Sequence, residues 1–404
     1  MNKSFKWALH INFFVFAILL NSVGIVILKS INNYGVTELK ASTLELFKDM
    51  PIAIISFAFA SFLPRIGYKK VMLIALSIVS LGLLQMYLGN NFVSAQILFA
   101  IVGSTFALIK VAVYGSIGMV TSGEKEHNSL MSTIEGTFMF GVALAYFLFP
   151  AFNVPNDPNA WLNVYLVLLG LVLVAGAFLS RIPELPKASA ENTLAQEFKA
   201  MLGLIVKMLV IVFVISAFLY VMAEQGIMTW LPTFNEKVLN LSEDNSIRMA
   251  SILAITLGVG RIIGGKLTER FHWSAVLSVA IVGAMMLVAF VLPEALDAEV
   301  REGGIRIFGL PLMAFIFPLV GLFIAPIYPL LNSVVLSALP KALHSPMTGL
   351  IVLFSATGGT LGSRITAYFF GRLGGGAFYF SLVPMALLLV AVFLLKRLTA
   401  KNNA

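Results

Sequence analysis

Charged side chains stand inside stretches of sequence that are otherwise apolar enough to cross a lipid bilayer. The basic ones are Lys48, Lys110, Arg261 and Arg364, and the acidic ones in or beside the same stretches are Glu45, Asp49, Glu135, Glu224 and Glu269. A charge at the centre of a membrane helix costs about 3 kcal/mol. Four isolated cations would cost about 10 kcal/mol, which is comparable with the stability of a whole domain. We therefore expect these groups to face one another, water or a polar solute.

The elements that must position these charges are membrane helices. Of the 404 residues, 59% are hydrophobic and only 11% are charged, whereas soluble domains carry about 25% charged residues. Runs of about 20 apolar residues each cross a bilayer. The sequence predicts an all-α membrane protein with twelve such helices, near residues 7–29, 42–64, 71–89, 93–120, 129–151, 161–181, 203–230, 246–268, 273–292, 308–338, 346–371 and 374–397. The first run has no small-residue cleavage site, so we interpret it as a retained helix.

A polar stretch in the middle of the chain divides these helices into two groups of six. We predict an N-terminal bundle at residues 1–181, a cytoplasmic linker at 182–202 and a C-terminal bundle at 203–404, with part of the linker forming a short amphipathic helix on the membrane surface. If both termini are cytoplasmic, most of the 27 Lys and Arg lie on the cytoplasmic side, at the chain termini or in loops. The positive-inside rule then predicts that orientation in the plasma membrane, which for a bacterium is the inner membrane.

Several classes of function are excluded by what the sequence lacks. It has no cysteine, which removes disulfides and thiolate chemistry. No phosphate-binding loop and no clustered histidines occur, so we expect no nucleotide, metal or other cofactor. The basic residues are dispersed and do not suggest a nucleic-acid surface. Nearly all of the chain is needed to cross the membrane, so we expect no enzyme, and the predicted partners are a small solute, a coupling ion and the lipid bilayer.

The two halves carry similar basic turns after their second helix, which indicates a duplicated unit of the kind found in secondary transporters. The second copy has Gly265, Leu267, Glu269 and Arg270, and the first has Pro64, Arg65, Gly67 and Lys69. These turns resemble the signature of the major facilitator superfamily, approximately G-x-L-x-D-R-x-G-R-K. The C-terminal half is also similar to the fucose permease branch of sugar and proton symporters, in Phe218–Val221, Glu224 with Gln225, Trp230, Gly260 with Arg261, Tyr328 with Pro329, and Ser333.

The resemblance implies two pseudo-symmetric six-helix bundles that rock about a solute, but one feature departs from it. The branch has acids in helices 1 and 4 as its proton and sugar sites. Here helix 1 offers Asn21 and Gly24, and Lys110 stands where we would align the helix 4 acid. A cation at this position favours a solute with a negative group, such as a carboxylate, or a displaced acid held by Lys110.

We expect two sets of functional side chains. The predicted solute-binding residues are Asn21, Lys110, Tyr114, Tyr220, Glu224, Gln225, Tyr328, Asn332 and Arg364, and the predicted proton carriers are Glu135 and Glu224. Glu45, Lys48, Asp49, Arg65, Arg261, Glu269 and Arg270 are assigned to gating or to structure. For the triplet at 45, 48 and 49 the choice is between a gate and a wet helix end, and Arg261 is expected to pair near Glu269. We interpret Trp230 as part of an interfacial belt.

The favoured function is proton-coupled uptake of a small polar solute, sugar-like or anionic. We expect a monomer, and the residues do not decide between a proton and sodium as the coupling ion. A permanent ion pair between Lys110 and Glu135 remains the structural alternative. The functional alternative is a proton-coupled antiporter that exports drugs or metabolites, although helix 5 lacks the G-P-x-x-G-G element of such exporters. A membrane-embedded enzyme or a sensor fits less well, because no serine and histidine share a predicted depth.

Overall fold

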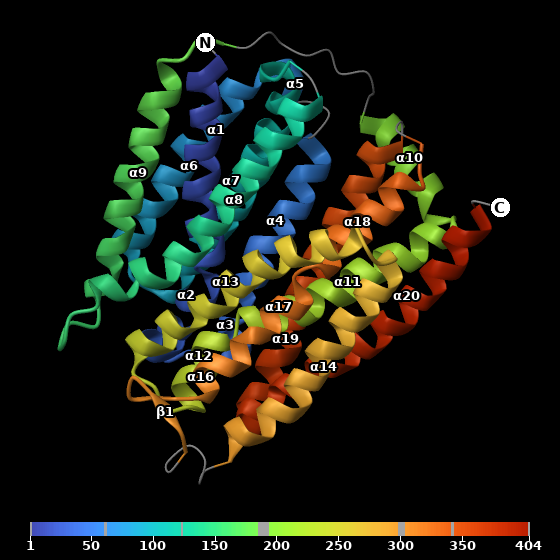
Figure 1. The fold of residues 1–404 in the computed structure, drawn as a ribbon. Coiled ribbons are helices and arrows are strands. Elements are labelled where there is room, and N and C mark those ends of the chain that lie inside the picture. Colours follow the sequence, from blue (N-terminus) through green and yellow to red (C-terminus); the bar gives the residue numbers. More distant parts are fainter. Residues whose placement is uncertain are drawn as a thin grey trace. The chain divides into compact units, whose positions relative to one another are not determined.

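The computed structural model describes residues 2–59, 63–122, 124–184, 194–297, 304–340 and 343–402. These residues are mostly helical (Figure 1) and form two compact units, one of residues 1–36 with 44–196 and the other of residues 37–43 with 197–404. The predicted linker falls at this division. Its residues 185–193 lie outside the described part of the chain, and α10 (Leu194–Ile205) follows them as the expected short helix.

The first unit contains the helices expected from the N-terminal half. They are α1 (Asn2–Asn21), α2 (Val23–Tyr34), α4 (Thr43–Phe59), α5 (Leu63–Ile66), α6 (Tyr68–Gly89), α7 (Phe92–Val120), α8 (Glu124–Leu148) and α9 (Asn163–Ser180), with 3₁₀ turns at η1 (Pro150–Phe152) and η2 (Ala160–Leu162). The first predicted helix is interrupted at Ser22, whose hydroxyl donates to the Leu19 carbonyl at 2.8 Å. Such side-chain bonds to the preceding turn compete with the helical ladder and bend it.

Close backbone approach in the first unit occurs at Gly103 of α7. A Cβ added there would lie 2.1 Å from the Lys48 carbonyl oxygen of α4. Only a glycine permits this packing, which places the charged turn of α4 directly against α7.

The second unit contains α3 (Glu38–Ala41), α11 (Met208–Met228), α12 (Leu231–Lys237), α13 (Glu243–Thr268), α14 (Trp273–Leu296), α16 (Met313–Ile316), α17 (Val320–Ile324), α18 (Ile327–Ser337), α19 (His344–Leu373) and α20 (Leu382–Asn402), with η3 (Phe317–Leu319) and η5 (Gly374–Ser381). The longest seam joins α11 and α19. Cβ atoms added at Gly358 and Gly362 would lie 2.3 and 2.1 Å from the carbonyl oxygens of Phe218 and Met222. These small residues let the two helix backbones approach closely.

Within the described residues, ten segments are long and apolar enough to cross a membrane. One of them, Pro346–Ala400, contains both α19 and α20, and α4 is not among the ten because it has only 17 residues and three of them are charged. The finding is consistent with the twelve helices expected.

The prediction of one helix over 308–338 is wrong. Arg306–Ile307 (β1) and Leu310–Pro311 (β2) form an antiparallel hairpin, and its turn residues Phe308 and Gly309 have φ values of 52° and 78°. The rest of the segment is divided among α16, η3, α17 and α18, with breaks near Pro318 and Pro326. Each proline lacks the N–H that a continuing helix requires. Apolar composition indicated a membrane crossing here but could not show these interruptions.

Candidate functional site

In the first unit, an amine, a phenol and a carboxylate come together within the membrane-spanning helices. Lys110 and Tyr114 are one turn apart on α7, and the Lys110 Nζ lies 5.9 Å from the centre of the Tyr114 ring. The Tyr114 hydroxyl donates a hydrogen bond to Oε1 of Glu135 on α8. All three side chains are half-buried. The structure thus brings together three predicted residues, which we call the N-cluster.

A direct ion pair between Lys110 and Glu135, the structural alternative considered from the sequence, stays a prediction. The Glu135 carboxylate accepts its hydrogen bond from the Tyr114 phenol. Because α7 supplies the donor and α8 the acceptor, the bond depends on how these two helices pack.

Aromatic rings border the N-cluster, and no pattern in the sequence pointed to them. Phe13 of α1 lies 5.7 Å from the Tyr114 ring and 4.9 Å from that of Phe138, and Phe106 packs 6.0 Å from Phe13. Ring faces of this kind exclude water and can stack on a flat or ring-shaped solute. Only the tertiary packing of α1, α7 and α8 assembles them.

The charged triplet of α4 is buried, so the interpretation as a wet helix end is wrong. Glu45 is 0% exposed and Lys48 4%, and the Lys48 Nζ lies 2.5 Å from Glu45 and 3.5 Å from Asp49. The spacing of three and four residues lets one helical face satisfy these charges locally. The Gly103 contact of α7 and the nearby ring of Tyr146 on α8 bury them. A gating role for the triplet remains a proposal.

The second unit holds another polar group of side chains, which we call the C-cluster. The Tyr220 hydroxyl donates to Glu224 Oε1 at 2.5 Å, one turn along α11. The Tyr220 ring stacks on that of Tyr328 from α18, with centres 5.6 Å apart and planes 24° apart. The Tyr328 hydroxyl contacts Ser355 of α19 at 3.3 Å. Three helices therefore contribute to one hydrogen-bonded and stacked group.

Arg261 of α13 belongs to this C-cluster. Its charge acts on the hydroxyls of both Tyr220 and Tyr328, as does the opposite charge of Glu224. Glu269, the expected neighbour of Arg261, is exposed at the end of α13. The expected pairing of Arg261 near Glu269 stays a prediction.

The other predicted solute-binding residues have separate positions. Asn332 of α18 bonds to Tyr328, and its Oδ1 is buried without a hydrogen-bond partner in the described part of the chain. Gln225 accepts from Thr229 at 3.3 Å, and Asn21 donates to the Ala17 carbonyl at 2.9 Å. Arg364 is exposed in the middle of α19.

Trp230 does not form an interfacial belt. It is fully buried, its Nε1 donates to Ser363 at 3.0 Å, and its ring packs 5.7 Å from Phe370. A buried indole N–H needs such a partner, and α19 supplies it.

The basic turn of the first half has a clear structural role. Gly67 has a φ of 99°, a conformation that favours glycine. The following Lys69 donates to the carbonyls of Ser180 and Ile182 at 2.9 and 2.5 Å. A cation is favourable at this end of α9 because the last helical carbonyls are unpaired there. Arg65 in this turn and Arg270 in the corresponding turn of the second half are exposed.

Comparison with known proteins shows the family. The model of the Major Facilitator Superfamily matches residues 8–363, and this chain belongs to that family. No curated protein matched the chain. The fold is similar to that of the E. coli fucose:proton symporter FucP, with 15% identity, a TM-score of 0.65, and coverage of 96% of this chain and 98% of that one.

Two further solved structures share the fold. A D-xylose-proton symporter is 14% identical with a TM-score of 0.69, over 97% of this chain and 96% of that one. The nucleoside transporter NupG is 15% identical with a TM-score of 0.72, over 97% of this chain and 98% of that one. The protein is a membrane-embedded transporter of a small-molecule solute and not an enzyme.

Proposed function

We propose that this transporter couples the inward movement of protons to uptake of a small sugar-like solute that carries a carboxylate. The observation that carries the proposal is the N-cluster, in which a membrane-embedded amine lies beside a phenol and a carboxylate on two different helices. Intramembrane ions of this kind are functional by default. Lys110 binds the solute's negative group, and Glu135 carries the proton.

The C-cluster supports a sugar-like solute. Stacked Tyr220 and Tyr328 offer ring faces and hydroxyls, and the buried Oδ1 of Asn332 is an acceptor ready for a solute hydroxyl. Binding sites for small polar molecules combine apolar and aromatic walls with a few polar groups that fix orientation.

Arg364 supplies a second cation to the solute path. A charge exposed in the middle of a membrane helix would cost about 3 kcal/mol if it faced hydrocarbon, so an exposed Arg364 supports a polar surface on that side of α19. The solved structures with a similar fold include a fucose:proton and a D-xylose-proton symporter, which supports sugars and protons as the transported species.

The orientation and state proposed are those of a plasma-membrane monomer with both termini cytoplasmic. The Lys and Arg bias of the loops supports this topology. Under it, Lys69 and its partners at the end of α9 lie on the cytoplasmic side, where the positive-inside rule favours cations.

The experiment that tests the proposed solute compares uronates with neutral sugars. In thermal-shift measurements on purified protein, glucuronate or galacturonate should raise the melting temperature of the wild type, because a ligand that binds the folded state stabilises it by mass action. Lys110→Met should abolish this shift, and Lys110→Arg should retain part of it. Equal shifts from a uronate and its neutral sugar in wild type and Lys110→Met would overturn the role of Lys110.

Transport direction is tested in proteoliposomes. An inward proton gradient should accelerate uptake of the stabilising solute. If an inward proton gradient accelerated solute export, the protein would instead be an antiporter. If uptake responded only to a sodium gradient, sodium would be the coupling ion in place of the proton.

A further inference from the structure

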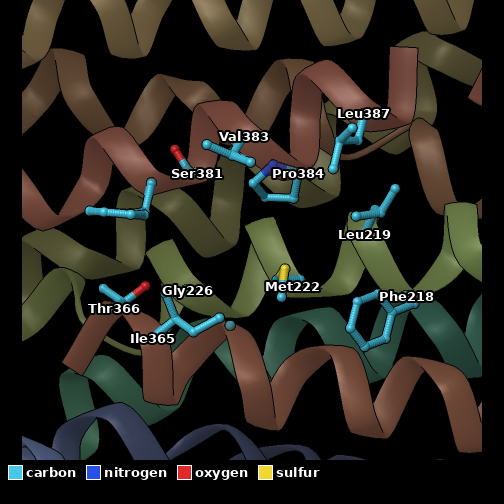
Figure 2. Close-up of a pocket in the computed structure, with 12 residues that line it drawn as sticks. Phe218, Leu219, Met222, Gly226, Ile365, Thr366, Ser381, Val383, Pro384 and Leu387 are labelled. Atoms are coloured by element: carbon cyan, nitrogen blue, oxygen red, sulfur yellow. The ribbon is translucent and has the colours of Figure 1, made fainter. Parts of the chain in front are cut away.

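The second unit contains an apolar cavity of about 310 Å³ between α11, α19 and the start of α20 (Figure 2). Its walls include Phe218, Leu219 and Met222 of α11, Ile365 of α19 and Pro384 of α20. The volume is at the lower end of ligand-binding cavities, about 300 Å³ and upwards. None of these residues belongs to the C-cluster.

The mouth of the cavity is formed by residues that face hydrocarbon. All three helices belong to the segments apolar enough to span a membrane, Met208–Lys237 and Pro346–Ala400. On α20, the lining residues Val383 and Leu387 are 56% and 53% exposed. Apolar side chains exposed on a membrane-spanning helix contact lipid, so the cavity is open to acyl chains.

The cavity also has a polar and an apolar end. Figure 2 shows Thr366 and Ser381 on different helices at one end of the cavity, with Leu219 and Leu387 at the other end. Ser381 immediately precedes α20, whereas Leu387 lies about 9 Å further along the helix axis. The polar end is therefore at a helix terminus, near the membrane surface, and the apolar end is deeper.

This arrangement matches the orientation of a phospholipid, whose ester groups lie near the surface and whose chains point inward. Thr366 and Ser381 are 6% and 8% exposed, and the Ser381 hydroxyl donates to the Phe378 carbonyl at 2.7 Å. A cavity left empty would forfeit dispersion contacts along all of its apolar walls, and an acyl chain restores them.

We propose that this cavity binds one acyl chain of a membrane phospholipid and thereby braces α11 against α20. On α11, Met222 and Gly226 face the chain, and Glu224 of the C-cluster lies between them in sequence. The backbones of α11 and α19 are in direct contact, since a Cβ on Gly362 would lie 2.1 Å from the Met222 carbonyl oxygen. α11 also packs directly against α20, and the cavity lies beside that contact.

The test uses substitutions at the exposed rim, where a larger side chain is tolerated. Leu387→Trp and Val383→Trp each place an indole in the mouth of the cavity. Leu394→Trp is the matched control: Leu394 is 44% exposed, lies on the same face of α20 seven residues beyond Leu387, and does not line the cavity. All three variants should purify as folded protein.

Two measurements follow with defined probes. Native mass spectrometry of the full chain in detergent should detect one retained phospholipid on the wild type and on Leu394→Trp, and at least a tenfold lower occupancy on the two rim variants. Dioleoyl phosphatidylethanolamine and oleate should raise the melting temperature of the delipidated wild type by several degrees, and glycerophosphoethanolamine, which has no chain, should not.

Equal lipid retention in wild type and both rim variants would overturn the proposal, as would stabilisation by the chain-free headgroup compound. Stabilisation that is equal in Leu387→Trp and Leu394→Trp would show that lipid acts elsewhere on the surface and would also overturn it. None of these outcomes depends on which solute the protein transports.

Discussion

The N-cluster and the C-cluster use the same pair of groups in different geometry. In both, a tyrosine hydroxyl donates to a glutamate within a membrane-spanning helix bundle. In the C-cluster the two residues are one turn apart on α11, so no movement of helices can separate them. In the N-cluster the tyrosine is on α7 and the glutamate on α8, so a shift between these helices breaks the bond.

The charges around the two glutamates also differ. In the C-cluster, Arg261 and Glu224 act on the same two tyrosine hydroxyls, whereas in the N-cluster Lys110 lies beside the phenol that bonds Glu135. A carboxylate whose hydrogen bond can be removed in an apolar setting binds a proton more easily. Under the proposal, the proton moves through Glu135 of the N-cluster, where Lys110 also binds the solute's negative group, and the C-cluster binds the rest of the solute.

The largest expected effect comes from Glu135→Gln. One pH unit is worth about 1.4 kcal/mol per proton, so a gradient of two units supports up to about 100-fold accumulation of a solute moved with one proton. The variant should lose this accumulation and keep exchange of solute across the membrane without a gradient. Counterflow and gradient-driven uptake in the same proteoliposomes measure both. Full accumulation by the variant would remove Glu135 from coupling.

The matched change in the C-cluster, Glu224→Gln, should weaken binding and leave coupling intact. It removes a hydrogen bond to a charged group, worth about 1.5–3 kcal/mol, so the apparent KM should rise roughly 10- to 100-fold. The accumulation ratio at saturating solute should match the wild type. If accumulation collapsed at unchanged KM, the two clusters would have exchanged roles and the comparison would fail.

A smaller effect is expected from Tyr328→Phe. The ring still stacks on Tyr220, but the contact with Ser355 is lost. A neutral hydrogen bond is worth about 1 kcal/mol, so solute affinity should fall about fivefold in a thermal-shift titration. Tyr328→Leu, which removes the stack as well, should cost more. Equal losses in the two variants would show that the ring stack contributes nothing, and an unchanged affinity in Tyr328→Phe would show that the hydroxyl contributes nothing.

The smallest effect is expected at the ion pair of Glu38 and Lys237, which sets a scale for both clusters. Burial raises the pKa of Glu38, but the hydrogen bond and charge of Lys237, 2.9 Å away, outweigh it and hold that pKa below its usual 4.5. A depressed pKa adds stability above pH 4.5, and this stability is lost as the pH falls through the lowered value. Glu38→Gln should cost at most about 1 kcal/mol at pH 7, since the pair is partly exposed.

Thermal unfolding in detergent at pH 7 and at pH 3 checks this prediction. The difference between wild type and Glu38→Gln should shrink at the lower pH, and Lys237→Gln should behave in the same way. A difference that grows on acidification would contradict the sign.

Much of the fold was open to prediction because a bilayer restricts the backbone to helices and closed barrels. Apolar runs therefore indicated nearly every crossing, and the basic turns at Gly67 and Gly265 indicated the family. The hairpin at β1 and β2 and the breaks at Pro318 and Pro326 were missed. Apolar composition is the same in a straight helix and in an interrupted one.

The candidate residues were identifiable for a similar reason. A charge in hydrocarbon is costly, so Lys110, Glu135 and Glu224 stood out without any knowledge of their neighbours. Residues whose contribution is apolar gave no such signal, and Phe13 and Phe138 were missed because phenylalanine is common throughout a membrane protein.

The sequence alone indicated a membrane transporter of the twelve-helix type with charged residues at membrane depth. The reason is that the free-energy cost of a charge or of an unpaired backbone group in lipid depends on each residue separately. Only the tertiary structure decided which ions meet. Tyr114 reaches Glu135 and Arg261 reaches Tyr220 and Tyr328 because of the rotation of each helix about its axis. That rotation is set by packing against other helices, and no local pattern of residues contains it.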